Sequence, residues 1–231
     1  MSKHMQRPEI ICHMVTSLDG RLLPDRWPFS EDHIMSMYEA TAAKLDASGW
    51  AVGRATMLHY VDEGEPDLLD APRSRQPIVA RSDAEKIGIC FDRLGRLRPE
   101  SGDIDGDHLV IVVSDKVSQR HIDRLVKSGV SVFFSGPDGE DIETALCDIA
   151  ASFDVKRLLL EGGGEMNGAF LSKDLIDETS ILILPVLDGG QDVPAIVAQP
   201  DGHKARKTGL ISSETLADGT VWLRHRLIKE V

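Results

Sequence analysis

The stretch Val155-Lys-Arg-Leu-Leu-Leu-Glu-Gly-Gly-Gly-Glu-Met-Asn-Gly-Ala-Phe-Leu-Ser172 indicates the fold of this chain. It contains a continuous apolar run at residues 158–160, which is typical of a strand buried on both faces. The run ends at the carboxylate of Glu161, and three consecutive glycines follow. From Met166 onward, apolar residues recur at the spacing of one helix face. We therefore expect a strand, a glycine turn and a helix in direct succession.

This succession is able to bind an anion. Glycines let backbone N–H groups approach a phosphate closely, and a helix N-terminus adds partial positive charge. The alternative is that the turn is only a tight connection, and the residues alone leave both interpretations open. The spacing departs from the GxGxxG dinucleotide fingerprint because the third glycine is Gly168, one place late, and no Lys-Ser/Thr pair of a P-loop follows. Glu161 stands where the strand ends, which is where open α/β sheets place ligand contacts.

Composition excludes several classes of protein. The chain of 231 residues suffices for one sizeable α/β domain or two small ones, and its net charge of −12 argues against a general nucleic-acid or membrane-surface binder. The three cysteines form no CxxC pair and the histidines show no HxH or HxxxH spacing, so we expect reduced thiols and no metal site. No apolar run approaches the roughly 20 residues of a membrane span. With a polar N-terminus and no signal peptide, the chain is predicted to be cytoplasmic.

Strands and helices alternate along most of the chain. Residues 84–107, rich in glycine, are expected to form a surface loop, and an Asp-Gly turn at 218–219 followed by alternating apolar residues predicts an antiparallel hairpin at 210–228. We predict a single α/β domain with a mostly parallel central sheet, helices on both faces and this antiparallel hairpin. Strands are expected at 9–16, 49–53, 77–80, 108–114, 130–134 and 181–187, and helices at 30–46, 116–128 and 141–152.

Several side chains near predicted strand ends are candidate ligand contacts, and all but Thr56 also have a structural alternative. Asp19 is either a turn former or a carboxylate facing a cleft. Trp27 stacks on a flat ligand or caps the edge of the core. Thr56 follows a strand and is well placed to touch a ligand. Arg81 and Ser82 hold a phosphate or belong to a solvated loop.

Four segments, in this order, resemble the reductase domain of the riboflavin-biosynthesis deaminase/reductase family, which has a dihydrofolate-reductase-like fold. The resemblance extends over one domain at residues 8–229, and no zinc deaminase signature is present, so only the reductase half is implied. The segments are Ser17-Leu-Asp-Gly-Arg21, Val52-Gly-Arg-Ala-Thr56, Leu160-Glu-Gly-Gly-Gly164 and Ile183-Leu-Pro-Val-Leu-Asp-Gly-Gly190.

The resemblance implies an NADPH-dependent oxidoreductase, a homodimeric pyrimidine reductase of riboflavin biosynthesis. The family reaction, that of 5-amino-6-(5-phosphoribosylamino)uracil reductase, transfers a hydride directly to the ribosylamino carbon, so positioning matters more than a strong acid or base. The partner is then a small phosphorylated pyrimidine- or pterin-like substrate, and neither nucleic acid nor a membrane. Two alternatives stay open: a relative that reduces another such substrate, for example dihydrofolate, or an NADPH-binding protein without turnover.

The resemblance also assigns roles to residues. Glu161 and Asp19 are the predicted catalytic residues, and Glu161 contacts the substrate. Lys44 is the one residue able to replace an arginine that the family has before its second strand. The segment after Thr56 lacks the family's Asp-Asn-Pro and phosphate-binding arginine, so the cofactor half matches better than the substrate half. The predicted NADPH contacts are Val15, Trp27 and Thr56 around the nicotinamide, Arg81 and Ser82 at the 2′-phosphate, and Gly163, Gly164, Glu165, Met166, Asn167 and Gly168 at the pyrophosphate.

Overall fold

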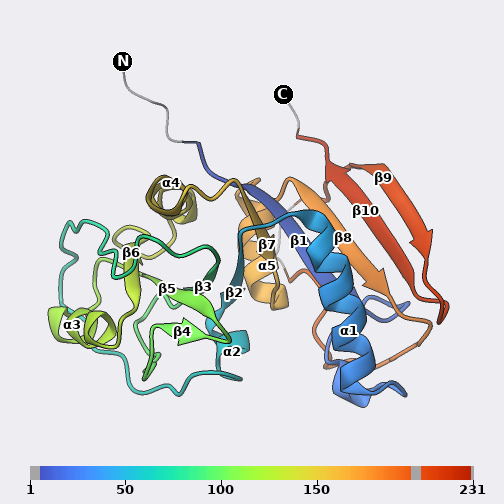
Figure 1. Ribbon diagram of the computed structural model, residues 1–231, viewed down its shortest axis with the longest axis horizontal. Helices are drawn as coiled ribbons and strands as arrows, with labels where there is room; N and C mark the ends of the chain where they lie inside the picture. Colours follow the sequence, from blue (N-terminus) through green and yellow to red (C-terminus); the bar gives the residue numbers. More distant parts are fainter. Residues whose placement is uncertain (1–5, 199–203, 230–231) are drawn as a thin grey trace. The chain divides into compact units, whose positions relative to one another are not determined.

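The computed structural model describes residues 6–198 and 204–229 (Figure 1). The chain forms two compact units. Among the described residues, unit 1 consists of 6–8 and Ser48–Leu158, and unit 2 consists of Glu9–Ala47, 159–198 and 204–229. Strand β7 (Arg157–Leu160) contains the boundary between them. Each unit is described by itself.

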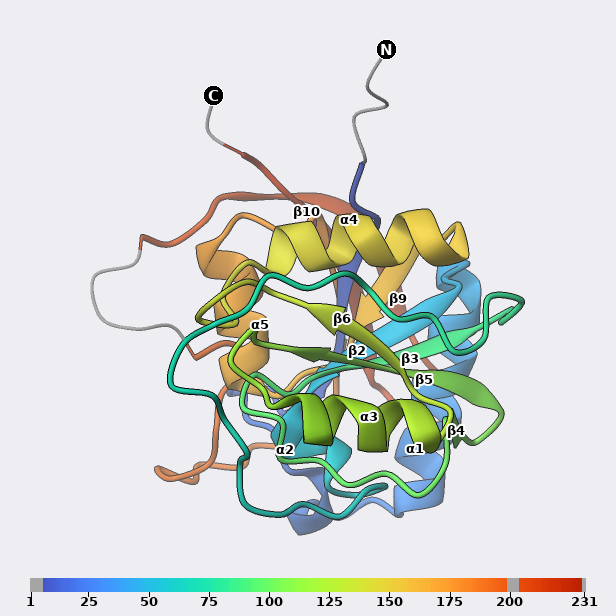
Figure 2. The same ribbon diagram turned by 90° about the vertical axis from the view of Figure 1, so that its left-hand side faces the viewer.

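Unit 1 is an α/β layer with mostly parallel strand pairing. Strands β2–β3, β3–β5 and β5–β6 pair in parallel, and β4 pairs antiparallel with β5. Figure 2 shows α3 and α4 on opposite sides of these strands. The elements are β2 (Gly49–Gly53), α2 (Arg54–Met57), β3 (Ile87–Phe91), β4 (Asp103–Ile104), β5 (Asp107–Val113), α3 (Gln119–Lys127), β6 (Ser131–Phe134) and α4 (Ile142–Phe153).

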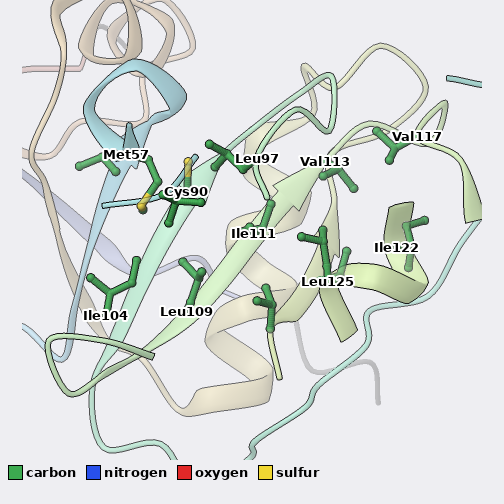
Figure 3. Close-up of a cluster of buried hydrophobic side chains, with 14 of the residues drawn as sticks. Met57, Cys90, Leu97, Ile104, Leu109, Ile111, Val113, Val117, Ile122 and Leu125 are labelled. Carbon is green, nitrogen blue, oxygen red and sulfur yellow. The ribbon is translucent and has the colours of Figure 1, made fainter. Parts of the chain in front are cut away.

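The core of unit 1 comes from the central strands and α3. Cys90 of β3 pairs with Val52 of β2 and Ile111 of β5, and all three are buried. Ile122 and Leu125 of α3 belong to the same cluster (Figure 3). Residues 109–113 of β5 are all apolar and buried, so this parallel strand shows the continuous apolar run that the sequence suggested.

Unit 2 carries the predicted hairpin. Strand β8 pairs in parallel with β1 and antiparallel with β10, and β10 pairs with β9 (Figure 1). The register of the hairpin shifts between Arg224 and His225, which marks a bulge. The elements are β1 (Glu9–Thr16), η1 (Pro24–Arg26), α1 (Glu31–Ala42), η2 (Ala43–Leu45), α5 (Gly164–Ser172), β8 (Glu178–Ile183), β9 (Thr208–Thr215) and β10 (Val221–Leu227).

A buried polar network joins four elements of unit 2. Trp222 Nε1 donates to Ser180 Oγ at 2.8 Å, and Ser180 Oγ lies 3.0 Å from His13 Nδ1. Since Ser180 Oγ accepts from Trp222, its own proton is available to His13 Nδ1, and His13 Nε2 then donates to the Tyr38 carbonyl at 3.2 Å. Burial lowers the pKa of His13 to about 4, so the ring is neutral at pH 7. The network links β1, β8, β10 and α1 through a satisfied core histidine.

The fold class is confirmed, with two errors at the level of single strands. The predicted strand at 77–80 is only an isolated bridge, in which Ile78 exchanges both hydrogen bonds with Val132 at 2.8 Å. Pro77 before it has no N–H to extend the pairing. The predicted surface loop at 84–107 contains β3, whose Ile87 and Ile89 are fully buried. The loop prediction rested on Gly95, Pro99, Gly102 and Gly106, all of which follow this strand.

Gly88 within β3 makes room for a tertiary contact. A Cβ at position 88 would lie 2.4 Å from Trp50 Cζ2, so the indole of β2 occupies the space that a side chain would fill. Strand β8 (Glu178–Ile183) overlaps the strand predicted at 181–187 but begins three residues earlier and ends before Pro185, which has no N–H to continue the pairing.

Candidate functional site

Asp19 anchors one loop of unit 2 to another. Its carboxylate accepts hydrogen bonds from Ser17 Oγ at 2.7 Å and from the backbone N–H groups of Asp188 and Gly189 at 3.0 and 2.9 Å. The hydrogen bond from Ser17, followed by those from the two N–H groups, holds the pKa of Asp19 well below its usual range. Asp19 is therefore ionised and positions the segment after β8. Its catalytic role stays a prediction.

Trp27 is buried, with 6% of its surface exposed, so it caps the core edge of unit 2. Its Nε1 donates to Asp188 Oδ2 at 2.9 Å, and Arg26 Nη1 lies 3.4 Å from Asp188 Oδ1. The hydrogen bond from Trp27 is the main reason that the pKa of Asp188 is lowered. Asp188 thus joins Trp27 to the Asp19 loop. Asp188 belongs to one of the segments that carry the family resemblance, but the sequence alone predicted no contact for it.

Strand β7, the glycine turn and α5 follow one another directly, as the sequence predicted. Gly162 has φ +95°, and a Cβ there would lie 2.9 Å from Met14 Cε. A Cβ at Gly164 would lie only 2.4 Å from the Ala195 carbonyl oxygen. Gly164 therefore needs glycine because a backbone oxygen of unit 2 lies against it, and Gly162 needs glycine because its positive φ is strained for other residues.

Residues 195–198 pack along the start of α5. Ala198 N donates to the Gly164 carbonyl at 2.9 Å, and Asn167 Nδ2 donates to the Ile196 carbonyl at 2.7 Å. Asn167 is fully buried, and its Oδ1 has no hydrogen-bond partner in the described part of the chain. The first N–H groups of α5 lack intrahelical acceptors, as in every α-helix, and they provide the positive end expected of a phosphate site.

The other predicted residues of unit 2 have different environments. Glu161 and Val15 are half-buried, Glu161 just after β7 and Val15 within β1. Lys44 Nζ lies 3.9 Å from Glu214 Oε1 and 5.1 Å from the centroid of the Trp222 ring. Its ammonium group therefore already has a carboxylate and an aromatic ring beside it. Met166 and Gly168 belong to α5, and Glu165 in its first turn is exposed. A carboxylate at that place stabilises the helix and opposes a bound phosphate.

Three predicted residues lie in unit 1. Thr56 is half-buried in α2, directly after β2, as expected. Arg81 and Ser82 are exposed, and Arg81 Nε lies 3.5 Å from Asp83 Oδ1. Because the segment before them forms only one bridge, the expectation that they follow a strand is wrong. Their contact with a cofactor stays a prediction.

Sequence reasoning missed the carboxyl edge of the parallel strands in unit 1. Residues just after β3, β5 and β6 are joined there: Ser114 N donates to the Arg93 carbonyl at 3.1 Å, and Asp115 N donates to the Gly136 carbonyl at 3.0 Å. Open α/β sheets bind ligands at this edge. A prediction of strand β3 would have placed Asp92 and Arg93 at this edge, because they directly follow the strand.

Within residues 6–198 and 204–229, no group of three or more His, Cys, Asp or Glu side chains is arranged to hold a metal ion. Among the same residues, no helix is long and apolar enough to cross a membrane. Cys12, Cys90 and Cys147 are free thiols, and burial raises the pKa of Cys12 to about 12.

The sequence pattern of the RibD C-terminal domain matches residues 8–222. The chain belongs to this family. A relative from Aquifex aeolicus, 2,5-diamino-6-ribosylamino-4(3H)-pyrimidinone 5′-phosphate reductase, is 26% identical over 212 residues, which are 88% of each chain. The riboflavin biosynthesis protein RibD of Chlamydia muridarum is 24% identical over 82% of this chain and 49% of its own length.

Solved structures share the fold. A pyrimidine reductase-like protein from Corynebacterium diphtheriae superposes with a TM-score of 0.70 at 14% identity, covering 96% of this chain and 93% of its own. Acinetobacter baumannii RibD superposes with a TM-score of 0.66 at 20% identity over 96% of this chain and 58% of its own. These likenesses establish the reductase-domain fold of the family.

Proposed function

We propose that this protein is an NADPH-dependent pyrimidine reductase that converts a phosphoribosylamino-pyrimidine into its ribitylamino form. The observation that carries the proposal is the β7–glycine turn–α5 unit, in a chain that belongs to the RibD C-terminal domain family. The name of the Aquifex relative points to the 2,5-diamino-pyrimidinone 5′-phosphate as substrate, and the family resemblance to the 5-amino-uracil analogue. We further propose that residues 8–229 act as one domain and that the protein is a cytoplasmic homodimer.

The residues present fit the phosphates of a dinucleotide. The N–H groups in the first turn of α5 point toward its N-terminus and would hold the pyrophosphate, while Gly162 and Gly164 allow the preceding turn. NADPH supplies a hydride when it is bound.

Reduction adds one hydride to the ribosyl C1′ and one proton to the ring oxygen, which becomes a hydroxyl. Direct transfer needs alignment of the reacting atoms more than a strong acid or base. Glu161, at the carboxyl end of β7, would orient a hydroxyl-bearing substrate as a hydrogen-bond acceptor. Asp19, held ionised by its three hydrogen bonds, would position the loop after β8 and not exchange a proton.

The experiment is a substrate panel read by loss of absorbance at the nicotinamide band. The purified chain with NADPH should consume it when either phosphoribosylamino-pyrimidine is added, and not with dihydrofolate. NADPH oxidation with dihydrofolate, and not with either pyrimidine, would instead indicate a relative that reduces dihydrofolate. A rise in melting temperature with NADPH, without oxidation by any substrate, would identify an NADPH-binding protein instead. If NADPH neither binds nor is oxidised, the proposal is wrong.

A further inference from the structure

Unit 1 has a cationic surface pocket that the proposed roles of its residues do not use. The pocket has a volume of about 300 Å³ and is lined by Arg73, Ser74, Arg75, Gln76, Ile78, Gln119 and Phe134. It lies beside the carboxyl edge of the parallel strands, since Arg73 N donates to the Asp115 carbonyl at 3.1 Å and Asp115 follows β5. Two arginines, polar side chains and an apolar wall therefore meet at the edge where α/β sheets bind ligands.

Arg75 is held in place by neutral groups. Its Nη1 donates to Gln119 Oε1 at 2.6 Å, its Nη2 donates to the Val117 carbonyl at 2.8 Å, and the guanidinium carbon lies 5.7 Å from the centroid of the Phe134 ring. The ring and the two acceptors fix the plane of the guanidinium without neutralising its charge. In the described residues, its buried Nε has no hydrogen-bond partner.

The residues that line the pocket carry two positive charges and no negative one. Asp115 and Asp123 act on Arg75 only through space, and Asp123 accepts a hydrogen bond from Gln119 Nε2 at 2.8 Å. Burial is the main cause that lowers the pKa of Arg75, repulsion from the neighbouring Arg73 lowers it further, and the two aspartates partly offset this. Gln119 is the first residue of α3, so the positive end of that helix also lies at the pocket. A bound dianion would relieve this repulsion.

We propose that the Arg73–Arg75 pocket binds a phosphate monoester. An arginine fork matches the oxygens of a phosphate, and the planar guanidinium of Arg75 offers a stacking surface for a flat group carried with it. For the source of the phosphate the inference rests on the proposed function, because such a reductase meets two monoesters: the 2′-phosphate of NADPH and the 5′-phosphate of the pyrimidine. The chain lacks the family's phosphate-binding arginine after Thr56, and this pocket supplies arginines from the same connection between β2 and β3.

The test uses small probes that contain no nicotinamide or pyrimidine. Calorimetric titration compares 2′-AMP with adenosine and ribose 5-phosphate with ribose. At least one phosphorylated probe should bind more tightly than its phosphate-free counterpart, and Arg73→Ala combined with Arg75→Gln should weaken that binding about tenfold or more. Arginine-dependent binding of ribose 5-phosphate would assign the pocket to the substrate and leave the 2′-phosphate to Arg81 and Ser82. Arginine-dependent binding of 2′-AMP would assign the 2′-phosphate to Arg73 and Arg75 in their place. The matched control, Lys127→Ala, removes an exposed cation at the other end of α3 and should leave binding unchanged.

A single variant guards against misfolding of the double variant. Arg73→Ala retains the backbone hydrogen bond to Asp115 and removes only an exposed side chain, so its circular dichroism should equal that of the wild type while its affinity falls. Phosphorylated and phosphate-free probes binding equally, or a folded arginine variant with wild-type affinity, would overturn the proposal. NADPH oxidation by the wild type with arginine-independent probe binding refutes the pocket and keeps the reductase. If probe binding depends on the arginines but no substrate leads to NADPH oxidation, the pocket is supported and the proposed reductase activity is refuted.

Discussion

Gly164→Ala tests the packing of residues 195–198 on α5. The new Cβ would lie 2.4 Å from the Ala195 carbonyl oxygen, so that oxygen must move by about 1 Å to reach an ordinary contact of 3.4 Å. Overpacking of this kind costs about 1–3 kcal/mol. Weakening of the hydrogen bond from Ala198 N to the Gly164 carbonyl adds about 1 kcal/mol. The lower entropy of an unfolded alanine offsets about 0.5 kcal/mol, so we expect a loss of about 1.5–3.5 kcal/mol.

Urea unfolding without any ligand measures this loss separately from cofactor binding. Trp27 and Trp222 belong to unit 2, and Trp50→Phe in every variant removes the tryptophan of unit 1 from the fluorescence signal. The matched control is Gly209→Ala, where the nearest atom to a Cβ is Ile228 Cδ1 at 3.9 Å, and its stability should stay within about 0.5 kcal/mol of the parent. If Gly164→Ala is as stable as Gly209→Ala, the close approach of residues 195–198 to α5 is refuted.

Three further predictions concern charge and chemistry. Glu161→Gln should leave the fold and NADPH affinity intact and lower turnover about tenfold, because the amide loses the charge that orients the substrate; lost NADPH binding would make Glu161 a loop anchor. The folded-state pKa of His13 is about 4 against 6.5 for a free histidine, so the stability from its neutral form is complete above pH 6.5 and falls as the pH drops toward 4. The free energy of unfolding measured with urea should decrease by about 3 kcal/mol over this window, and His13→Asn should reduce its dependence on pH. Replacing Arg81 and Ser82 by alanine should weaken NADPH and spare NADH in titrations; equal weakening of both cofactors would exclude these residues as the 2′-phosphate site.

Local patterns predicted much of the architecture. Strand β1, the β7–α5 succession and the C-terminal hairpin were placed within a few residues, because apolar periodicity and Asp-Gly turns act over short stretches. The family was also recognised from short motifs, above all the carboxylate-glycine turn that begins at Glu161. These features depend on neighbouring residues, so they are visible without a structure.

Other features depend on residues far away in the chain. Strand β3 was missed because Gly95, Pro99, Gly102 and Gly106 favoured a loop over the whole of residues 84–107. Gly88 of this strand leaves room for the indole of Trp50, a contact that no local pattern predicts. The contacts of Asp19 and Trp27 with Asp188 join residues more than 150 positions apart. These contacts determine that Trp27 is buried and that Asp19 is a loop anchor.

The sequence by itself determined the fold class, the family and the position of the glycine turn, since each follows from residue types at short spacing. Only the tertiary structure decided which glycines are required and which cations share a pocket. Gly164 is required because the Ala195 carbonyl lies against it, and Arg75 faces a pocket because Phe134, Gln119 and Val117 hold its guanidinium. The physical reason is that close packing and partly buried charge depend on distances between residues that the chain order does not contain.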